Sequence, residues 1–80
     1  MKIYDYKGKK NICGERLHEA RCKLRMTQSD LAAKLQLADI GIERDSISRI
    51  EIGTRFVADY ELKALSVILN VSVAWLLGME

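Results

Sequence analysis

The sequence predicts an all-α fold, a compact bundle of five short helices. Its 80 residues are 49% hydrophobic, which suffices for one core in one domain. The chain contains no proline, and its β-branched residues do not alternate with polar residues as they do in half-buried strands. We therefore divide the chain into an N-terminal arm, residues 1–10, and a helical domain, residues 11–80.

The arm is rich in lysine, and two of its tyrosines, Tyr4 and Tyr6, are candidates to dock it on the domain. The first helix is expected from about Asn11 to Leu24, with Asn11 as its N-cap. Apolar residues recur in this helix at helical spacing up to Leu24, and Arg21 lies in or beside their stripe. A charge at that position needs a partner elsewhere in the fold.

The second helix is expected to begin at Thr27, whose hydroxyl can cap it. Asp30 stands three residues later, which is the spacing of a capping box. Residues 37–43 then form the connection to the third helix. Gly41 in this connection fits a turn with positive φ.

The remaining helices have recognisable ends. The third is expected from about Arg44 to Glu51 and the fourth from about Asp59 to Leu69, and Ser72 caps a short fifth helix. Gly53 and Gly78 follow the third and fifth helices, as helix-ending glycines do.

The third helix has two different faces at 100° per residue. Ile47 and Ile50 form an apolar face that can pack on the domain. The opposite face carries polar residues that can read base edges, with one apolar residue at its end: Arg44, Asp45, Ser48, Arg49 and Ile52. Arginine can bind guanine O6 and N7 with two hydrogen bonds, aspartate can accept from cytosine N4, and an apolar side chain can contact a thymine methyl. Taken alone, such a face also suits an ordinary solvated helix, but the preceding helix and the core pattern favour the DNA-reading interpretation.

Charge is distributed unevenly. Residues 1–57 contain 12 Lys or Arg against 8 Asp or Glu, and residues 58–80 contain 1 against 3. A basic N-terminal part suits nucleic-acid binding on one side of the molecule. Ordinary solubilising charge explains the balance almost as well, so charge alone does not decide between them.

The chain offers little material for other kinds of site. If Cys13 and Cys22 both lie on the first helix, they are about 13 Å apart along its axis, too far for a disulfide. His18 is the only histidine, and no Cys or His pair has zinc spacing. We expect reduced thiols, no metal, no cofactor and no enzymatic activity, because no phosphate-binding glycine loop or nucleophile–base arrangement is evident. No apolar run reaches the roughly 20 residues of a membrane span, and no apolar signal core is present, so a cytoplasmic protein without membrane contact is expected.

Three blocks that occur in order carry a family resemblance: TQSDLA at residues 27–32, SISRIEIG at 46–53 and LNVSVAWLL at 69–77. From Gly14 to Gly78 the chain resembles the lambda-repressor-like, Xre/Cro-type helix-turn-helix domains. The resemblance implies a transcriptional regulator, a repressor in particular, that binds double-stranded DNA as a homodimer and reads the major groove with its third helix. The same fold also serves protein-interaction modules such as antitoxins or accessory subunits, which is the alternative interpretation.

The resemblance also assigns roles to individual residues. Arg44, Asp45 and Arg49 match base-reading positions, with Ser48 beside them. Backbone contacts are expected from Gln28, Ser46, Thr54 and Arg55, and Gln28 can also brace the reading helix. Arg21 and Glu51 match a pair that forms a structural salt bridge between the first and third helices, which accounts for the arginine beside the apolar stripe.

The chain departs from the family pattern at four places. The connection between the motif helices is about five residues longer than usual, which affects the register of the third helix. Arg25 occupies a position where the family often has glycine, so the first helix is expected to end without that device. Glu43 replaces the usual Ser or Thr cap of the third helix, and Ile52 replaces a polar or basic residue.

Overall fold

The computed structural model describes residues 5–80 and confirms the all-α prediction. Its five helices are α1 (Gly14–Lys23), α2 (Gln28–Leu37), α3 (Arg44–Ile52), α4 (Asp59–Leu69) and α5 (Val73–Leu76). Extended pairing within residues 5–80 is limited to one isolated bridge between Tyr6 and Lys9. No helix in the described part of the chain is long and apolar enough to cross a membrane.

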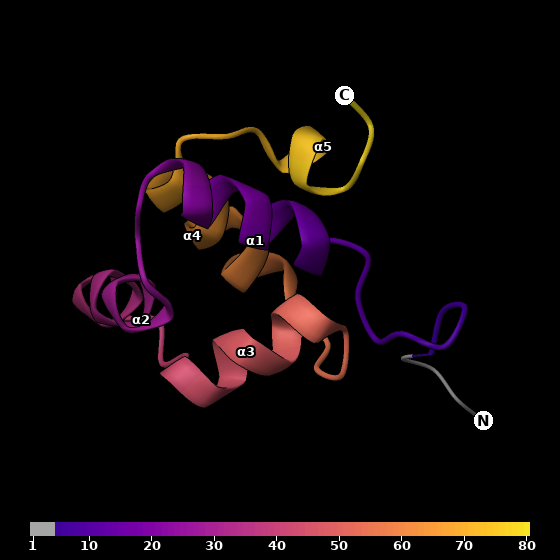
Figure 1. The fold of residues 1–80 in the computed structure, drawn as a ribbon, viewed down its shortest axis with the longest axis horizontal. Coiled ribbons are helices and arrows are strands. Elements are labelled where there is room, and N and C mark those ends of the chain that lie inside the picture. The colour runs from indigo at the N-terminus through magenta and orange to yellow at the C-terminus, as the bar shows by residue number, and fades with distance from the viewer. Residues whose placement is uncertain (1–4) are drawn as a thin grey trace.

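The central helix of the bundle is α1. It packs against α3, α4 and α5, and α2 packs against α3 and α4. In Figure 1, α3 runs along the lower edge of the molecule and α5 lies at the upper edge with the C-terminus, with α1 between them. The two short helices α3 and α5 are therefore on opposite sides of the domain.

The core draws side chains from every helix. Its largest fully buried members are Leu17, Leu31, Leu35, Ile47, Ile50, Leu65 and Leu76. Each such side chain contributes about 1.5–3 kcal/mol on burial. Burial of Ile47 and Ile50 agrees with the apolar face expected for the third helix and fixes its register despite the long connection. Leu24 was expected in the stripe of the first helix but is 48% exposed, because α1 ends before it and the chain turns away.

The start of α1 lies three residues later than the sequence suggested. Cys13 occupies the N-cap position and makes no side-chain capping bond. Asn11 instead caps from outside the helix, because its Oδ1 accepts a hydrogen bond of 2.9 Å from the backbone N–H of Gly14. The expected side chain therefore supplies the cap, but from a different backbone position.

The end of α1 corrects one expectation. Arg25 itself adopts the left-handed conformation, with φ 54°, that glycine usually supplies there. The N–H of Met26 then reaches the carbonyl of Arg21 at 3.1 Å, and the N–H of Arg25 reaches Cys22 at 3.0 Å. This is the hydrogen-bond pattern of a Schellman motif, so α1 ends with the usual device despite the missing glycine.

The connection after α2 contains a second correction. Gly41 does not have a positive φ, whereas Asp39 does, at 64°. The N–H of Ile40 bonds the carbonyl of Leu35 at 2.9 Å, which closes α2 with another Schellman motif. Ile40 then packs against the core, and Ile42 is buried in it. The longer connection is thus anchored by two apolar side chains.

The other helix starts vary in how well they are capped. Thr27 and Asp30 form the predicted reciprocal capping box, with bonds of 3.0 and 2.9 Å. Ser72 accepts a bond of 2.9 Å from the N–H of Trp75, as expected for α5. Glu43 stands at the N-cap of α3 without a side-chain bond, so α3 lacks the cap that serine or threonine would provide.

Candidate nucleic-acid interface

The polar face of α3 is open to solvent. Arg44, Asp45 and Arg49 are exposed, and Ser48 is half-buried beside them. Arg44 makes an exposed ion pair of 3.5 Å with Asp45, and Arg49 donates a bond of 3.3 Å to Ser46. These contacts remain within α3 and leave both guanidinium groups accessible to a ligand.

A salt bridge joins the inner side of α3 to α1, between the two residues expected to form it. Nε and Nη2 of Arg21 donate to the two carboxylate oxygens of Glu51 at 2.7 and 3.0 Å. Nη1 of Arg21 also donates to the carbonyl of Met26 at 2.8 Å, which ties the pair to the turn after α1. The two side chains are only 10% and 6% exposed, so a two-bond contact of this kind is largely shielded from water and salt.

Glu51 receives further donors. Gln28 at the start of α2 donates to its Oε1 at 3.1 Å, and Nδ1 of His18 lies 3.0 Å from the same oxygen. Burial by itself would raise the pKa of Glu51, but hydrogen bonds from Arg21, Gln28 and His18 lower it below its ordinary value. One carboxylate therefore links α1, α2 and α3, and Gln28 is the side chain that ties the start of α2 to it.

The residues after α3 form a second ion pair, which sequence reasoning missed. Arg55, expected at the DNA backbone, points both terminal nitrogens at Glu61 in α4, at 3.2 and 3.1 Å. Burial would raise the pKa of Glu61, but bonds from Arg55 and from the N–H of Ala58 lower it. Arg55 keeps 26% of its side chain exposed. The sequence signal for this pair was its spacing, because Arg55 lies six residues before Glu61, a glutamate in the first turn of α4.

Thr54 and Ser46 lie at the two ends of the exposed face. Thr54 is exposed, and its N–H and hydroxyl both bond the carbonyl of Arg49, at 2.8 and 3.3 Å. Ser46 lies in the first turn of α3 and is half-buried. Together with Gln28 and Arg55, they flank the base-reading candidates from α2, from α3 itself and from the loop after α3.

Asn11 holds the C-terminal end of α3 in place, a role that sequence reasoning did not foresee. Its Nδ2 donates to the carbonyls of Ile50 and Arg55 at 3.0 and 2.7 Å. Beside it, α1 and α3 approach so closely that a Cβ on Gly14 would collide with the carbonyl oxygen of Ile50. Only glycine fits that crossing.

The arm is docked against this same end of α3. Lys7 and Gly8 both have positive φ, at 53° and 84°, which forms a tight two-residue turn bridged by Tyr6 and Lys9. The N–H of Lys10 bonds the carbonyl of Gly53 at 2.8 Å. Tyr6 is 57% exposed, so it is not what docks the arm, and Tyr4 lies outside the described residues.

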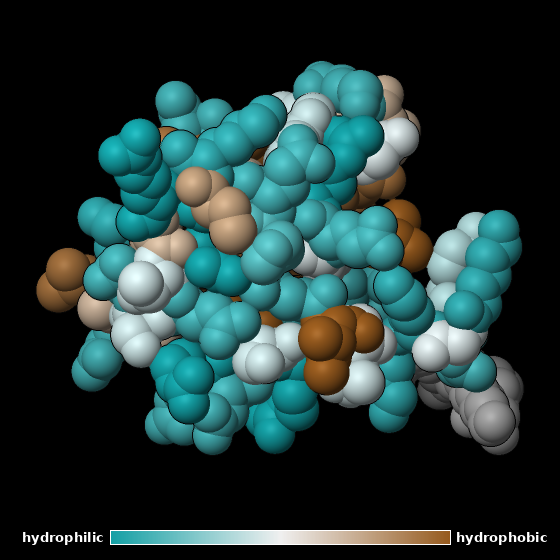
Figure 2. Space-filling model, viewed as in Figure 1, coloured by the Kyte–Doolittle hydropathy of each residue, from teal (hydrophilic) through white to brown (hydrophobic). Residues whose placement is uncertain are grey.

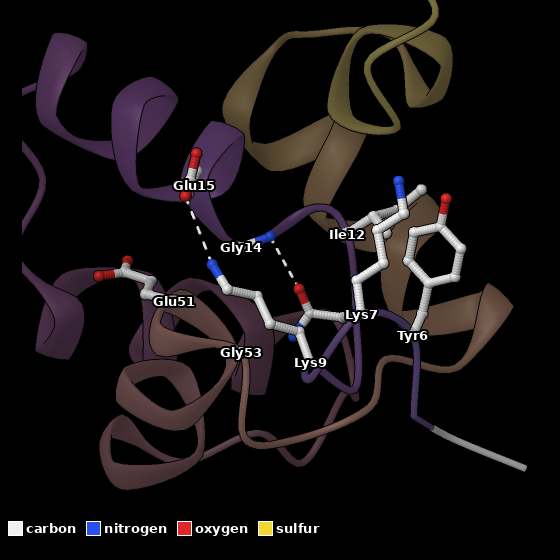
Figure 3. A pocket seen from close by; sticks show the side chains of 9 residues that line it. Tyr6, Lys7, Lys9, Ile12, Gly14, Glu15, Glu51 and Gly53 are labelled. Carbon is white, nitrogen blue, oxygen red and sulfur yellow. Dashed lines mark hydrogen bonds and ion pairs between the residues drawn. The ribbon is translucent and has the colours of Figure 1, made fainter. Parts of the chain in front are cut away.

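Figure 3 shows how Lys9 crosses Gly53 on its way to Glu15. A Cβ on Gly53 would lie 2.9 Å from Cδ of Lys9, and the lysine Nζ is 3.4 Å from Glu15. A glycine is therefore required at position 53 for two reasons: its φ is 88°, and a side chain there would take the space that Lys9 occupies. Lys7 keeps its ammonium group near the ring of Tyr6, 5.3 Å from the ring centroid.

The face seen in Figure 2 is mainly hydrophilic, with a few separate apolar patches. One of them lies over the C-terminal end of α3, where Ile52, the last residue of that helix, is 63% exposed.

Among residues 5–80 no group of three or more His, Cys, Asp or Glu side chains is arranged to hold a metal ion. The arrangement thus presents arginine, carboxylate and hydroxyl groups on one helix of fixed orientation.

Comparisons with known proteins place this geometry in a family. Residues 17–76 match the family model described as helix-turn-helix. A search of curated proteins gave no match. Among solved structures, the chain is similar to the P22 c2 repressor protein in complex with synthetic operator 9T in the presence of Tl+. The TM-score is 0.73 at 28% identity, covering 88% of this chain and 98% of that one. The chain belongs to the helix-turn-helix family of lambda-repressor-like domains, as its three sequence blocks predicted.

Proposed function

We propose that this protein is a sequence-specific transcriptional regulator of double-stranded DNA, a cytoplasmic repressor that reads the major groove with α3. The observation that carries the proposal is the exposed face of α3. Its arginines have no hydrogen-bond or ion-pair partner outside their own helix among residues 5–80, and the opposite face of the helix is buried in the core. The similar P22 c2 repressor was crystallised with an operator. Arg44 and Arg49 would bind guanine edges, Asp45 would accept from cytosine, and Ser48 would contact a base or phosphate.

Backbone contacts would surround these residues. Gln28 and Ser46 lie at the first turns of α2 and α3, and Thr54 lies in the loop after α3. Arg55 has donors beyond the two that bind Glu61, because a guanidinium carries five N–H groups. Contacts to phosphates position the protein without selecting a sequence, so these residues would fix the orientation of α3 in the groove.

A homodimer completes the proposal. One such domain reads only a few base pairs, and symmetric pairs of half-sites are the usual way to gain specificity. The position of α5 on the opposite side from α3 supports an interface there, because it leaves the reading helix free (Figure 1).

Selection of bound sites from a random double-stranded DNA library tests the function directly. A recovered consensus supports sequence-specific reading, and a consensus with two-fold symmetry supports the dimer. On the selected site, Arg44→Ala or Arg49→Ala should weaken binding by about 1–3 kcal/mol and relax the preference at one or two positions. Lys63→Ala on α4 removes an exposed positive charge away from α3 and serves as the matched control.

The competing function is a protein-interaction module on the same fold. Recovery of no consensus at low salt, with binding of all sequences equally weak, would favour that alternative. Equal losses on selected and random DNA for both arginine variants would show that they contact phosphates only. A salt series distinguishes the two DNA-binding modes, because phosphate contacts dominate the salt dependence.

A further inference from the structure

An imidazole separates Cys22 from the buried carboxylate of Glu51. Sγ of Cys22 lies 3.6 Å from Nε2 of His18, one helical turn earlier in α1. The other ring nitrogen, Nδ1, lies 3.0 Å from Oε1 of Glu51 in α3. Thiol, imidazole and carboxylate therefore stand in a row. This is the order in which a nucleophile is activated by a base that a third group orients.

The Nδ1 atom of His18 has two polar neighbours, Glu51 and Arg21. Nη2 of Arg21 also lies 3.0 Å from Nδ1, so the neutral ring either accepts from Arg21 or donates to Glu51 through that atom. Once Nε2 has taken the thiol proton, Nδ1–H donates to Glu51 and Nε2–H donates to the thiolate. Glu51 is held by Arg21 and Gln28, so it remains an acceptor in a fixed position.

Access to the two groups is open. Cys22 is exposed, and the His18 side chain is 57% exposed. The other cysteine provides an internal contrast, because Cys13 is only 2% exposed and burial raises the pKa of its thiol. The two cysteines lie nine residues apart, about 13 Å along a helix, which exceeds the reach of a disulfide. Both are free thiols.

We propose that Cys22 is an oxidative modification site, activated by His18, whose reagents are hydroperoxides. His18 takes the proton of the Cys22 thiol, and the thiolate sulfur attacks the terminal oxygen of the hydroperoxide. The S–O bond forms while the O–O bond breaks, and the departing alkoxide takes the proton from the imidazolium. Sulfur is oxidised by two electrons to a sulfenic acid, and the hydroperoxide is reduced to an alcohol.

The test uses the full chain with Cys13→Ser, so that Cys22 is the only thiol. Hydrogen peroxide is added at pH 7 and 10 °C, and sulfenic acid is followed by intact mass after trapping. Adding His18→Gln should slow the reaction by about a hundredfold, the lower end of the usual contribution of a positioned proton acceptor. Glu19→Gln is the matched control, since it removes a neighbouring charge in α1 without touching the row. Circular dichroism at the same temperature confirms that helix content is equal.

A second comparison makes the outcome independent of His18 substitution. The same Cys13→Ser chain, unfolded in urea, exposes Cys22 without its neighbours. Faster oxidation in the folded chain than in the unfolded one supports the proposal. Equal or slower oxidation in the folded chain would overturn it, as would an unchanged rate in the His18→Gln variant.

Discussion

Arg25 and Asp39 are non-glycine residues in the left-handed region, at φ 54° and 64°. Both occupy the position where a Schellman motif reverses the chain after a helix. For arginine this conformation costs about 1–2 kcal/mol relative to the right-handed one. The cost is tolerated because Met26 and Ile40, the residues that follow, are thereby directed into or against the core.

Replacing Arg25 by glycine should therefore stabilise the fold. Glycine removes the steric cost but increases the backbone freedom of the unfolded chain, which costs about 0.5–1 kcal/mol. The balance predicts that the free energy of unfolding rises by about 0.5–1 kcal/mol, which is measured as a higher midpoint of urea unfolding. Asp39→Gly is the comparison and should gain less, since aspartate tolerates the left-handed region better than arginine does. A lower midpoint for Arg25→Gly would contradict this account.

Glu51 should make stability depend on pH. Because its folded pKa lies below the ordinary value of 4.5, the unfolded chain binds more protons in acid. The contribution of the ionised carboxylate is complete above that ordinary value and is lost as pH falls through the folded pKa. Glu61 acts in the same direction, since its pKa is also lowered.

Glu51→Gln should accordingly destabilise the protein by about 3–5 kcal/mol at pH 7, since it leaves Arg21 buried without its charged partner. The difference from wild type should shrink as pH falls through the folded pKa, because wild type then also loses the carboxylate charge. Urea unfolding at pH 7 and at several acidic pH values measures both. A difference that stays constant with pH would mean that the charge of Glu51 is not what holds α1 to α3.

At the scale of helices, the sequence predicted best the elements whose signals are local. The box of Thr27 and Asp30 and the cap of Ser72 each act within one helical turn, and their helices begin where expected. Asn11 shows the limit. The sequence predicted that Asn11 caps the first helix. Its bonds to the carbonyls of Ile50 and Arg55, 39 and 44 residues later, could not be predicted because they depend on how α1 and α3 cross. Similarly, Gly41 suggested a turn that Asp39 makes instead, because the position of the chain reversal is set by where Ile40 and Ile42 can pack.

The N-terminal arm is the element for which structure and proposed function interact most directly. The backbone of Lys10 and the side chain of Lys9 dock it beside Gly53, and Lys7 is carried on the turn that projects from there. Deleting residues 1–10 should flatten the slope of log K against log salt on the selected DNA site, because Lys7, Lys9 and Lys10 would neutralise phosphates. The sequence preference should change little.

A triple variant, Lys7→Met, Lys9→Met and Lys10→Met, separates charge from docking, because methionine keeps an apolar stem of similar length over Gly53. It keeps the backbone bond from residue 10 to Gly53 while removing the three ammonium groups. The same flattening in this variant assigns the effect to charge. An unchanged slope in both variants would give the arm a purely structural role.

At the scale of the whole molecule, the sequence indicated which helix faces are buried but not which exposed surfaces meet another chain. Ile47 and Ile50 could be assigned to the core because burial follows from periodicity within one helix. The α5 end is different. Leu76 is fully buried and Trp75 packs partly on the core with Arg16 against its ring, at 4.6 Å from the ring centroid. Met79 is 76% exposed, so an apolar group remains outside, as the sequence suggested.

A two-fold dimer through the α5 end would cover that group and, with α3 at the opposite side of the domain (Figure 1), would leave both α3 helices free for DNA. Met79→Glu should then shift the protein to monomer and weaken binding to the selected site, with helix content intact because the side chain is already exposed. Leu77→Glu should do the same from a half-buried position. Leu37→Glu at the end of α2, where Leu37 is 89% exposed, is the matched control and should leave the assembly unchanged. Sedimentation velocity and site affinity measure the two effects. Wild-type protein that sediments as a monomer, both free and on DNA, would rule out this interface, since no association would then be left for the glutamate substitutions to disrupt.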